Sequence, residues 1–113
     1  MRKIEEAMNR AINTGRNATI GNTTVIHADD THMEVALHGN RIAQRVHMNG
    51  TTKWYISLAG WNTSTTKSRL NAILREQLGP RYSIYTKRGT VLLADAAGTT
   101  ELSADGWHHV QEL

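Results

Sequence analysis

The stretch HMEVALHGNRIAQRVHMNGTTKWYISL, residues 32–58, alternates apolar and polar side chains and contains two turn-forming dipeptides. Apolar residues at every second position predict strands with one buried face. The dipeptides are Gly39-Asn40 and Asn49-Gly50, and both accept the positive φ angles of tight hairpin turns. We therefore expect antiparallel strands at 32–38, 41–48 and 52–58.

The register of these strands follows from the rule that paired residues share a face of the sheet. A Gly39-Asn40 turn sets Met33 opposite Val46, and both are apolar. A three-residue loop, Asn49-Gly50-Thr51, sets Val46 opposite Trp54, so this loop is expected, with its glycine in the left-handed region. The solvent face then carries His32, Glu34, Arg45, His47, Lys53 and Tyr55.

Two segments show the spacing of three and four residues that is typical of an amphipathic helix. The first spans 2–13, and its apolar stripe is Ile4, Ala7, Met8, Ala11 and Ile12. The second begins after a cap at Thr63 or Ser64, whose hydroxyl accepts free amide hydrogens. It ends at Gly79-Pro80. Its apolar stripe is Leu70, Ile73, Leu74 and Leu78.

Further strands are expected at 23–28, 81–86 and 90–95, the last two joined across Lys87-Arg88-Gly89. The order α-β-β-β-β-α-β-β predicts an α+β fold, an antiparallel sheet with both helices packed on one face. Because the chain has no Phe, most of the core volume is expected from its three Trp residues together with the Ile, Leu and Val positions. Residues 1–95 form a single domain in this interpretation. Residues 96–113 show no sustained period and are expected to be a tail or a marginal segment of the same domain.

The composition narrows the class of protein. The chain has 113 residues and no Cys, which excludes disulfides, thiolate metal sites and a cysteine nucleophile. Acidic residues interrupt the N-terminal apolar positions, so no signal peptide is expected. No window approaches the roughly 18 apolar residues of a membrane span. We therefore expect a soluble protein of the cytoplasm with no membrane partner.

Positive charge is concentrated in the middle of the chain, where residues 35–94 contain nine Lys and Arg and one acid, Glu76. Such a surface is either simply solvated or contacts a polyanion. Hydroxyl and basic side chains crowd the predicted helix start at 62–69, where free amides attract anions. The alternative there is a plain Ser/Thr cap with its cations turned to solvent. The candidate binding residues are Trp61, Thr63, Ser64, Thr65, Thr66, Lys67 and Arg69, with Arg45, Lys53 and Tyr55 in addition.

Other kinds of site have weaker support. His32 opposite His47, with Glu34 adjacent, has the donors for a divalent metal, but neighbouring basic side chains would repel a cation. The basic sheet face also resembles a platform for single-stranded nucleic acid, although Tyr55 is the one aromatic expected on it. The sequence contains no nucleophile elbow, no paired carboxylates at a useful spacing and no dinucleotide fingerprint. We expect no catalytic residue, no metal, no cofactor and no enzymatic activity.

Two stretches resemble a known group of proteins: HGNRIA at 38–43 and LAGWNTSTTKSRLNAIL at 58–74. They are similar to small accessory proteins of tailed bacteriophages. In that group an amphipathic helix, an HGN-x-IA hairpin and a GW-x-T-x-TT-x-SRLNALL helix start occur in the same order. The resemblance covers roughly residues 2–95 and leaves the C-terminal tail unmatched. It implies a phage protein that works inside an infected bacterium, and it brings no activity with it.

The sequence therefore predicts a non-enzymatic phage accessory protein that binds nucleic acid or another polyanion through the basic helix start. Two alternatives stay open. One is an inhibitor or modulator of a host protein, such as a defence or transcription factor; the other is a structural or oligomeric phage protein. Trp61 either caps the core or is an exposed anchor for a partner, a role that Trp often takes in interfaces. The oligomeric state also stays open.

Overall fold

The structure is a computed structural model, and it describes residues 3–112. Two helices and nine strands follow the chain, and their bounds are α1 (Lys3–Thr14), β1 (Ala18–Ile20), β2 (Thr23–Asp29), β3 (His32–Leu37), β4 (Asn40–Met48), β5 (Thr51–Ile56), α2 (Ser64–Gln77), β6 (Ser83–Lys87), β7 (Thr90–Asp95), β8 (Gly98–Glu101) and β9 (His108–His109).

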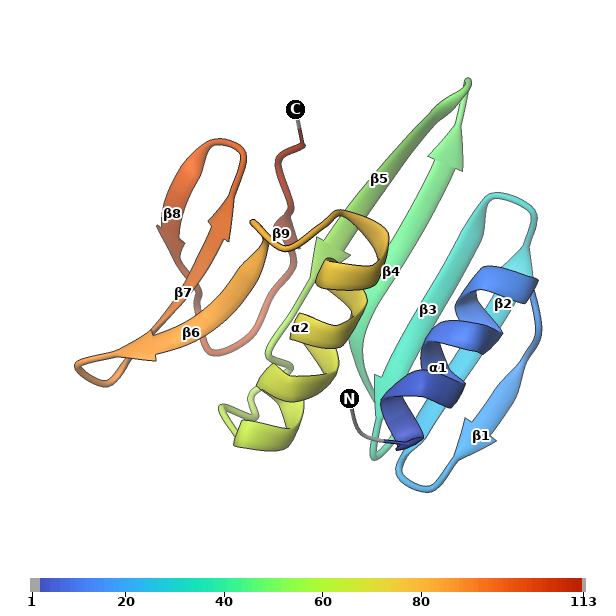
Figure 1. The fold of residues 1–113 in the computed structure, drawn as a ribbon, viewed down its shortest axis with the longest axis horizontal. Coiled ribbons are helices and arrows are strands. Elements are labelled where there is room, and N and C mark those ends of the chain that lie inside the picture. The colour runs from blue at the N-terminus through green and yellow to red at the C-terminus, as the bar shows by residue number, and fades with distance from the viewer. Residues whose placement is uncertain (1–2, 113) are drawn as a thin grey trace.

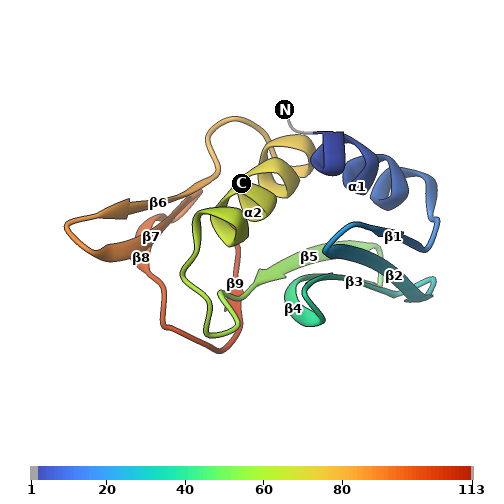
Figure 2. The ribbon, with the colours of Figure 1, turned by 90° about the horizontal axis from the view of Figure 1, so that it is seen from below.

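The strands form two antiparallel sheets. The larger one has the order β1-β2-β3-β4-β5-β9, and the smaller one has the order β6-β7-β8. Figure 1 shows α1 and α2 side by side across the larger sheet, with the smaller sheet on the other flank of α2. In Figure 2 both helices lie on one face of the larger sheet, and its other face is open. The predicted α+β class with helices on one face is confirmed.

The core lies between the helices and the larger sheet and extends to the smaller one. α1 contributes Met8, Ala11 and Ile12, and α2 contributes Leu70, Ile73 and Leu74. The outer members of the predicted stripes, Ile4, Ala7 and Leu78, are only partly buried. Trp54 and the Ile, Leu and Val positions supply the core as expected, whereas Trp61 and Trp107 are exposed, so the expected contribution of these two is wrong.

The first hairpin turns one residue earlier than predicted. His38 and Gly39 are its two central residues, with φ angles of 52° and 80°, as a type I′ turn requires. Pairing then shifts at a bulge, because Val35 faces Ala43 while Ala36 faces Arg41. The extra residue on β4 is Ile42, and both it and the following alanine are buried.

The second hairpin has a two-residue turn, not the predicted three-residue loop. Asn49 and Gly50 have φ angles of 55° and 77°, and this second type I′ turn joins β4 to β5. The predicted left-handed glycine is confirmed, but the register is wrong: Arg45 pairs with Trp54 and Val46 pairs with Lys53. Arg45 therefore shares the helix-covered face with Trp54. Val46 and Met48, which follow the bulge on β4 and were expected to point inward, therefore lie on the opposite face of the sheet.

The C-terminal segment contains more structure than its sequence pattern predicts. β8 extends the smaller sheet, and β9 adds to β5 at the edge of the larger sheet. Val110, directly after β9, is fully buried, and its amide donates to the Trp54 carbonyl at 2.9 Å. The sequence pattern did not predict these strands, since residues 96–113 were expected to be a tail or a marginal segment of the same domain.

Within residues 3–112, neither helix combines the length and the apolar character that crossing a membrane requires.

Candidate functional site

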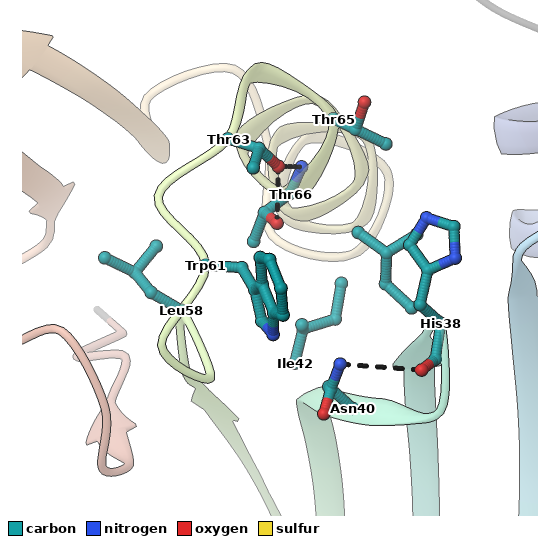
Figure 3. Close-up of a pocket in the computed structure, with 9 residues that line it drawn as sticks. His38, Asn40, Ile42, Leu58, Trp61, Thr63, Thr65 and Thr66 are labelled. Carbon is teal, nitrogen blue, oxygen red and sulfur yellow. Dashed lines mark hydrogen bonds between the residues drawn. The ribbon is translucent and has the colours of Figure 1, made fainter.

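A cavity of about 270 Å³ opens between the start of α2 and the β3–β4 turn. Its floor is apolar and consists of Leu37, Ile42 and Leu58, all buried. In Figure 3, Trp61 and His38 flank the cavity from opposite sides, with Ile42 between them. The rest of the lining comes from Asn40, Thr63, Thr65 and Thr66. Four of the predicted binding residues therefore meet at one cavity.

The loop before α2 fixes the position of Trp61. The amide of Trp61 donates to the Leu58 carbonyl at 2.8 Å, across a turn whose central residues, Ala59 and Gly60, have φ angles of 52° and 81°. Gly60 also donates to the Ala104 carbonyl at 2.7 Å. This backbone geometry leaves the indole 58% exposed. Trp61 is thus exposed and does not cap the core, while its role as an anchor for a partner stays a prediction.

The threonines at the helix start have separate roles. Thr63 is the N-cap: its Oγ1 accepts from the Thr66 amide at 3.1 Å and lies 3.0 Å from the Thr66 hydroxyl. Thr66 is fully buried, so the hydroxyls of this pair are engaged within the protein. Ser64 is exposed and Thr65 is half-buried. The predicted cap is confirmed at Thr63.

Lys67 turns away from the cavity toward the smaller sheet. Its Nζ donates to the Thr86 hydroxyl of β6 at 2.6 Å. Thr86 is followed in the chain by Lys87 and Arg88, which are exposed at the β6–β7 turn. We call these three cations, Lys67, Lys87 and Arg88, the basic cluster. The sequence pattern does not reveal it, because Lys67 and the turn are about 20 positions apart.

Arg69 has no role at the surface. It is 2% exposed, and its Nη1 lies 2.9 Å from Glu5 Oε2 in a buried ion pair. Its Nε donates to Thr23 Oγ1 at 3.0 Å, and its Nη2 donates to Asn22 Oδ1 at 3.2 Å. The prediction that Arg69 contacts a partner, and the alternative that it faces solvent, are both wrong.

The remaining candidates lie elsewhere on the larger sheet. Arg45 places its guanidinium carbon 5.9 Å from the centre of the Trp54 ring, on the helix-covered face. Lys53 is exposed on the open face. Tyr55 is half-buried on that face, with its ring centre 5.0 Å from that of His109. These three residues do not join the cavity beside Trp61.

The two histidines considered as possible metal ligands, His32 and His47, are not neighbours. His32 Nε2 lies 2.8 Å from Glu34 Oε1, and Glu34 also forms an ion pair with Arg41. His47 lies on the opposite face of the sheet, with Nδ1 2.6 Å from the Thr52 hydroxyl. Among residues 3–112, no three His, Asp or Glu side chains are grouped to hold a metal ion.

Two further groups bear on acid–base chemistry. Ser103 Oγ lies 3.0 Å from His108 Nε2, but this nitrogen also accepts from the Ser103 amide at 3.2 Å, so the contact closes an exposed loop. The Thr31 hydroxyl and amide donate to Asp29, and these hydrogen bonds lower the pKa of Asp29 below its usual 3.8. Asp29 is therefore ionised at neutral pH and is unsuited to donate a proton.

His38, Asn40 and Ile42 also line the cavity, and the sequence pattern does not reveal them as part of it. The dipeptide after His38 did indicate a turn, but nothing local indicates that this turn lies beside the start of α2. That proximity arises from the packing of α2 across β4. Lys87 and Arg88 are recognisable in the sequence as a basic turn. Their proximity to α2 is evident only from the contact between Lys67 and Thr86.

Comparison with known proteins identifies one family match. The family model described as the Kyanoviridae Gp96 protein matches residues 1–110. No curated protein and no solved structure matches the chain significantly. The predicted phage origin is confirmed, and the match extends past residue 95 into the segment that was expected to be unmatched. The chain belongs to the Kyanoviridae Gp96 protein family, a family of phage proteins.

Proposed function

We propose that this phage protein is a binding protein rather than an enzyme and that it contacts nucleic acid through the basic cluster. The observation that carries the proposal is the hydrogen bond from Lys67 to Thr86, which brings a cation of α2 beside the basic β6–β7 turn. A positive charge of α2 thereby lies beside the strand that leads into a turn with two more, Lys87 and Arg88.

The charges around the cluster support this function. The first turn of α2 contains no acidic residue. Within residues 3–112, the Asp and Glu side chains that form ion pairs are Glu5 and Glu34, and their partners lie outside the cluster. Cations without a carboxylate partner keep their charge available to an approaching anion, and phosphate contacts supply most of the non-specific affinity for nucleic acid.

The shape of the β6–β7 hairpin suits the same role. The hairpin extends from the body of the molecule beyond α2, and its turn lies at the tip (Figures 1 and 2). Arg88 and Gly89 are the central residues of this turn, with φ angles of 53° and 80°. A projecting turn exposes Lys87 and Arg88 on several sides, so a backbone of phosphates can reach both.

The test is binding of fluorescently labelled single-stranded DNA, duplex DNA and RNA, each titrated from low to near-physiological salt. The variant Lys67→Gln/Lys87→Gln/Arg88→Gln should weaken binding. It should also reduce the slope of log affinity against log salt by about 2 for single strands, since each phosphate contact contributes roughly 0.7.

A matched control removes the same charge from another surface. Lys3, Arg10 and Arg16 are exposed on or just after α1, on the far side of the molecule from the β6–β7 turn. Changing these three to Gln should leave the salt slope nearly unchanged. Equal losses in both triple variants would show an effect of net charge alone and contradict the proposed surface. Absence of binding at low salt would contradict nucleic-acid binding altogether and favour a host protein or a structural role.

A further inference from the structure

The cavity beside Trp61 has a composition that the basic cluster does not explain. Its floor is apolar, yet its rim carries polar groups without partners. Within residues 3–112, no hydrogen bond engages the Trp61 indole nitrogen or the His38 ring, and the Asn40 amide makes one long contact of 3.5 Å to the His38 carbonyl. An apolar floor with free donors and acceptors at its rim is typical of a site for a flat, polar-edged ring.

The size of the cavity limits the occupant. Pockets for drug-sized ligands usually occupy about 300–1,000 Å³. The cavity beside Trp61, at about 270 Å³, lies just below that range and suits a single ring system. An exposed indole at its wall offers a surface on which such a ring can stack.

The position of the cavity indicates what the ring is attached to. Thr66 lines the cavity, and the next residue, Lys67, is turned about 100° further around the helix axis and reaches Thr86 of β6. The cavity and Lys67 therefore lie on neighbouring faces of the first turns of α2. In Figure 1 the start of α2 lies between the β6–β7 turn, at the far left, and the β3–β4 turn at the bottom. A short polyanion held by the cluster can thus reach the cavity.

We propose that the cavity beside Trp61 binds one unpaired nucleobase of a nucleic-acid strand whose phosphates contact the basic cluster. This inference rests on the proposed function and narrows it to single strands. A base inside a duplex is stacked and paired, so it cannot enter such a cavity without flipping out. Stacking on Trp61 tolerates any base, while His38 and Asn40 line the same cavity and offer polar groups to its edge.

The experiment compares two probes, a labelled single-stranded DNA oligonucleotide and an abasic strand of the same length and charge. The wild-type protein should bind the base-containing strand about tenfold or more tightly, given the usual contribution of aromatic stacking. Trp61→Ala should remove this preference while leaving both the affinity for the abasic strand and the salt slope unchanged. Trp61→Phe should retain most of the preference, because a phenyl ring still stacks.

The matched control is Trp107→Ala, because Trp107 is the other exposed Trp, at 42%, and lies outside the cavity. It should bind both strands like the wild type. Equal affinity of the wild type for both strands, or full preference in Trp61→Ala, would overturn this inference and leave the proposed function standing. Failure to bind either strand would overturn both. Capture of a host protein that is lost in Trp61→Ala, without strand binding, would assign the cavity to a protein side chain and overturn the nucleobase.

Discussion

Arg69 and Glu5 form the most buried charged contact described in the molecule. Glu5 Oε2 accepts from Arg69 Nη1 at 2.9 Å and from the Ser68 hydroxyl at 2.5 Å. The other guanidinium donors bond Thr23 and Asn22, so the cation is well satisfied. Such a pair joins α1 to α2 and to the start of β2. Its presence requires both charges, because either one alone would be buried without compensation.

At the residue scale, Arg69→Met should lower the free energy of unfolding by about 3–5 kcal/mol, because it leaves the Glu5 carboxylate buried and unpaired. Urea denaturation followed by circular dichroism measures this loss. The double variant Glu5→Leu/Arg69→Met should lose less than the sum of the single variants, since no charge is then left alone. The control, Arg75→Met, changes an exposed arginine of the same helix and should cost little. Equal stability of the two Arg variants would contradict the role of the ion pair.

The same pair affects how binding experiments are designed. A loss of binding in an Arg69 variant would reflect a weakened fold and not a lost contact with a partner. The tests of the basic cluster therefore change Lys67 and leave Arg69 in place.

At the scale of elements, the hairpins show the difference between recognising a strand and knowing its register. Alternation in residues 32–58 correctly predicts three strands. The bulge at Ile42 then inserts one residue, which reverses the faces of every later position on β4. Arg45 consequently packs near Trp54, and Met48, which was expected inward, is exposed. The local sequence gives little sign of the bulge. What stabilises it is the burial of two successive apolar residues, and this burial depends on the packing of the core.

The second helix is a more reliable element, and its stripe leads to a prediction. Leu74 is fully buried within the core cluster. Leu74→Ala should lower the free energy of unfolding by about 2–5 kcal/mol, because it removes buried methyl groups and leaves a cavity. Chemical denaturation measures the loss, and Arg75→Ala, one position along, serves as the exposed control. A loss below roughly 0.5 kcal/mol would contradict the packing of α2 on the sheet.

At the scale of the whole molecule, the C-terminal segment joins the two sheets. The Val110 amide bonds the Trp54 carbonyl of β5, while the Ala96 amide bonds the Gln111 carbonyl at 3.0 Å. Asp95, at the end of β7, also accepts from the Gln111 amide at 2.9 Å. The last residues of the described chain thus connect the edge of the larger sheet with the smaller one.

Val110→Ala tests this connection. Because Val110 has no exposed surface, its truncation should lower the free energy of unfolding by about 1–3 kcal/mol. It should also speed hydrogen exchange at amides of β5 and β7, which would lose a packed neighbour. Glu112→Ala changes an exposed residue two positions later and should alter neither quantity. Unchanged stability in Val110→Ala would mean that the segment is dispensable.

The sequence by itself determined the helices, the strands of residues 32–58, a helix cap at Thr63 or Ser64, and the buried stripe of α2. These features depend on local spacing, which a helix or a strand expresses directly in its side chains. Tertiary structure decided the strand register, the burial of Arg69, the formation of β8 and β9, and the placement of Trp61 and His38 around one cavity. Each of these depends on residues far apart in the chain, whose contacts form only when the core packs.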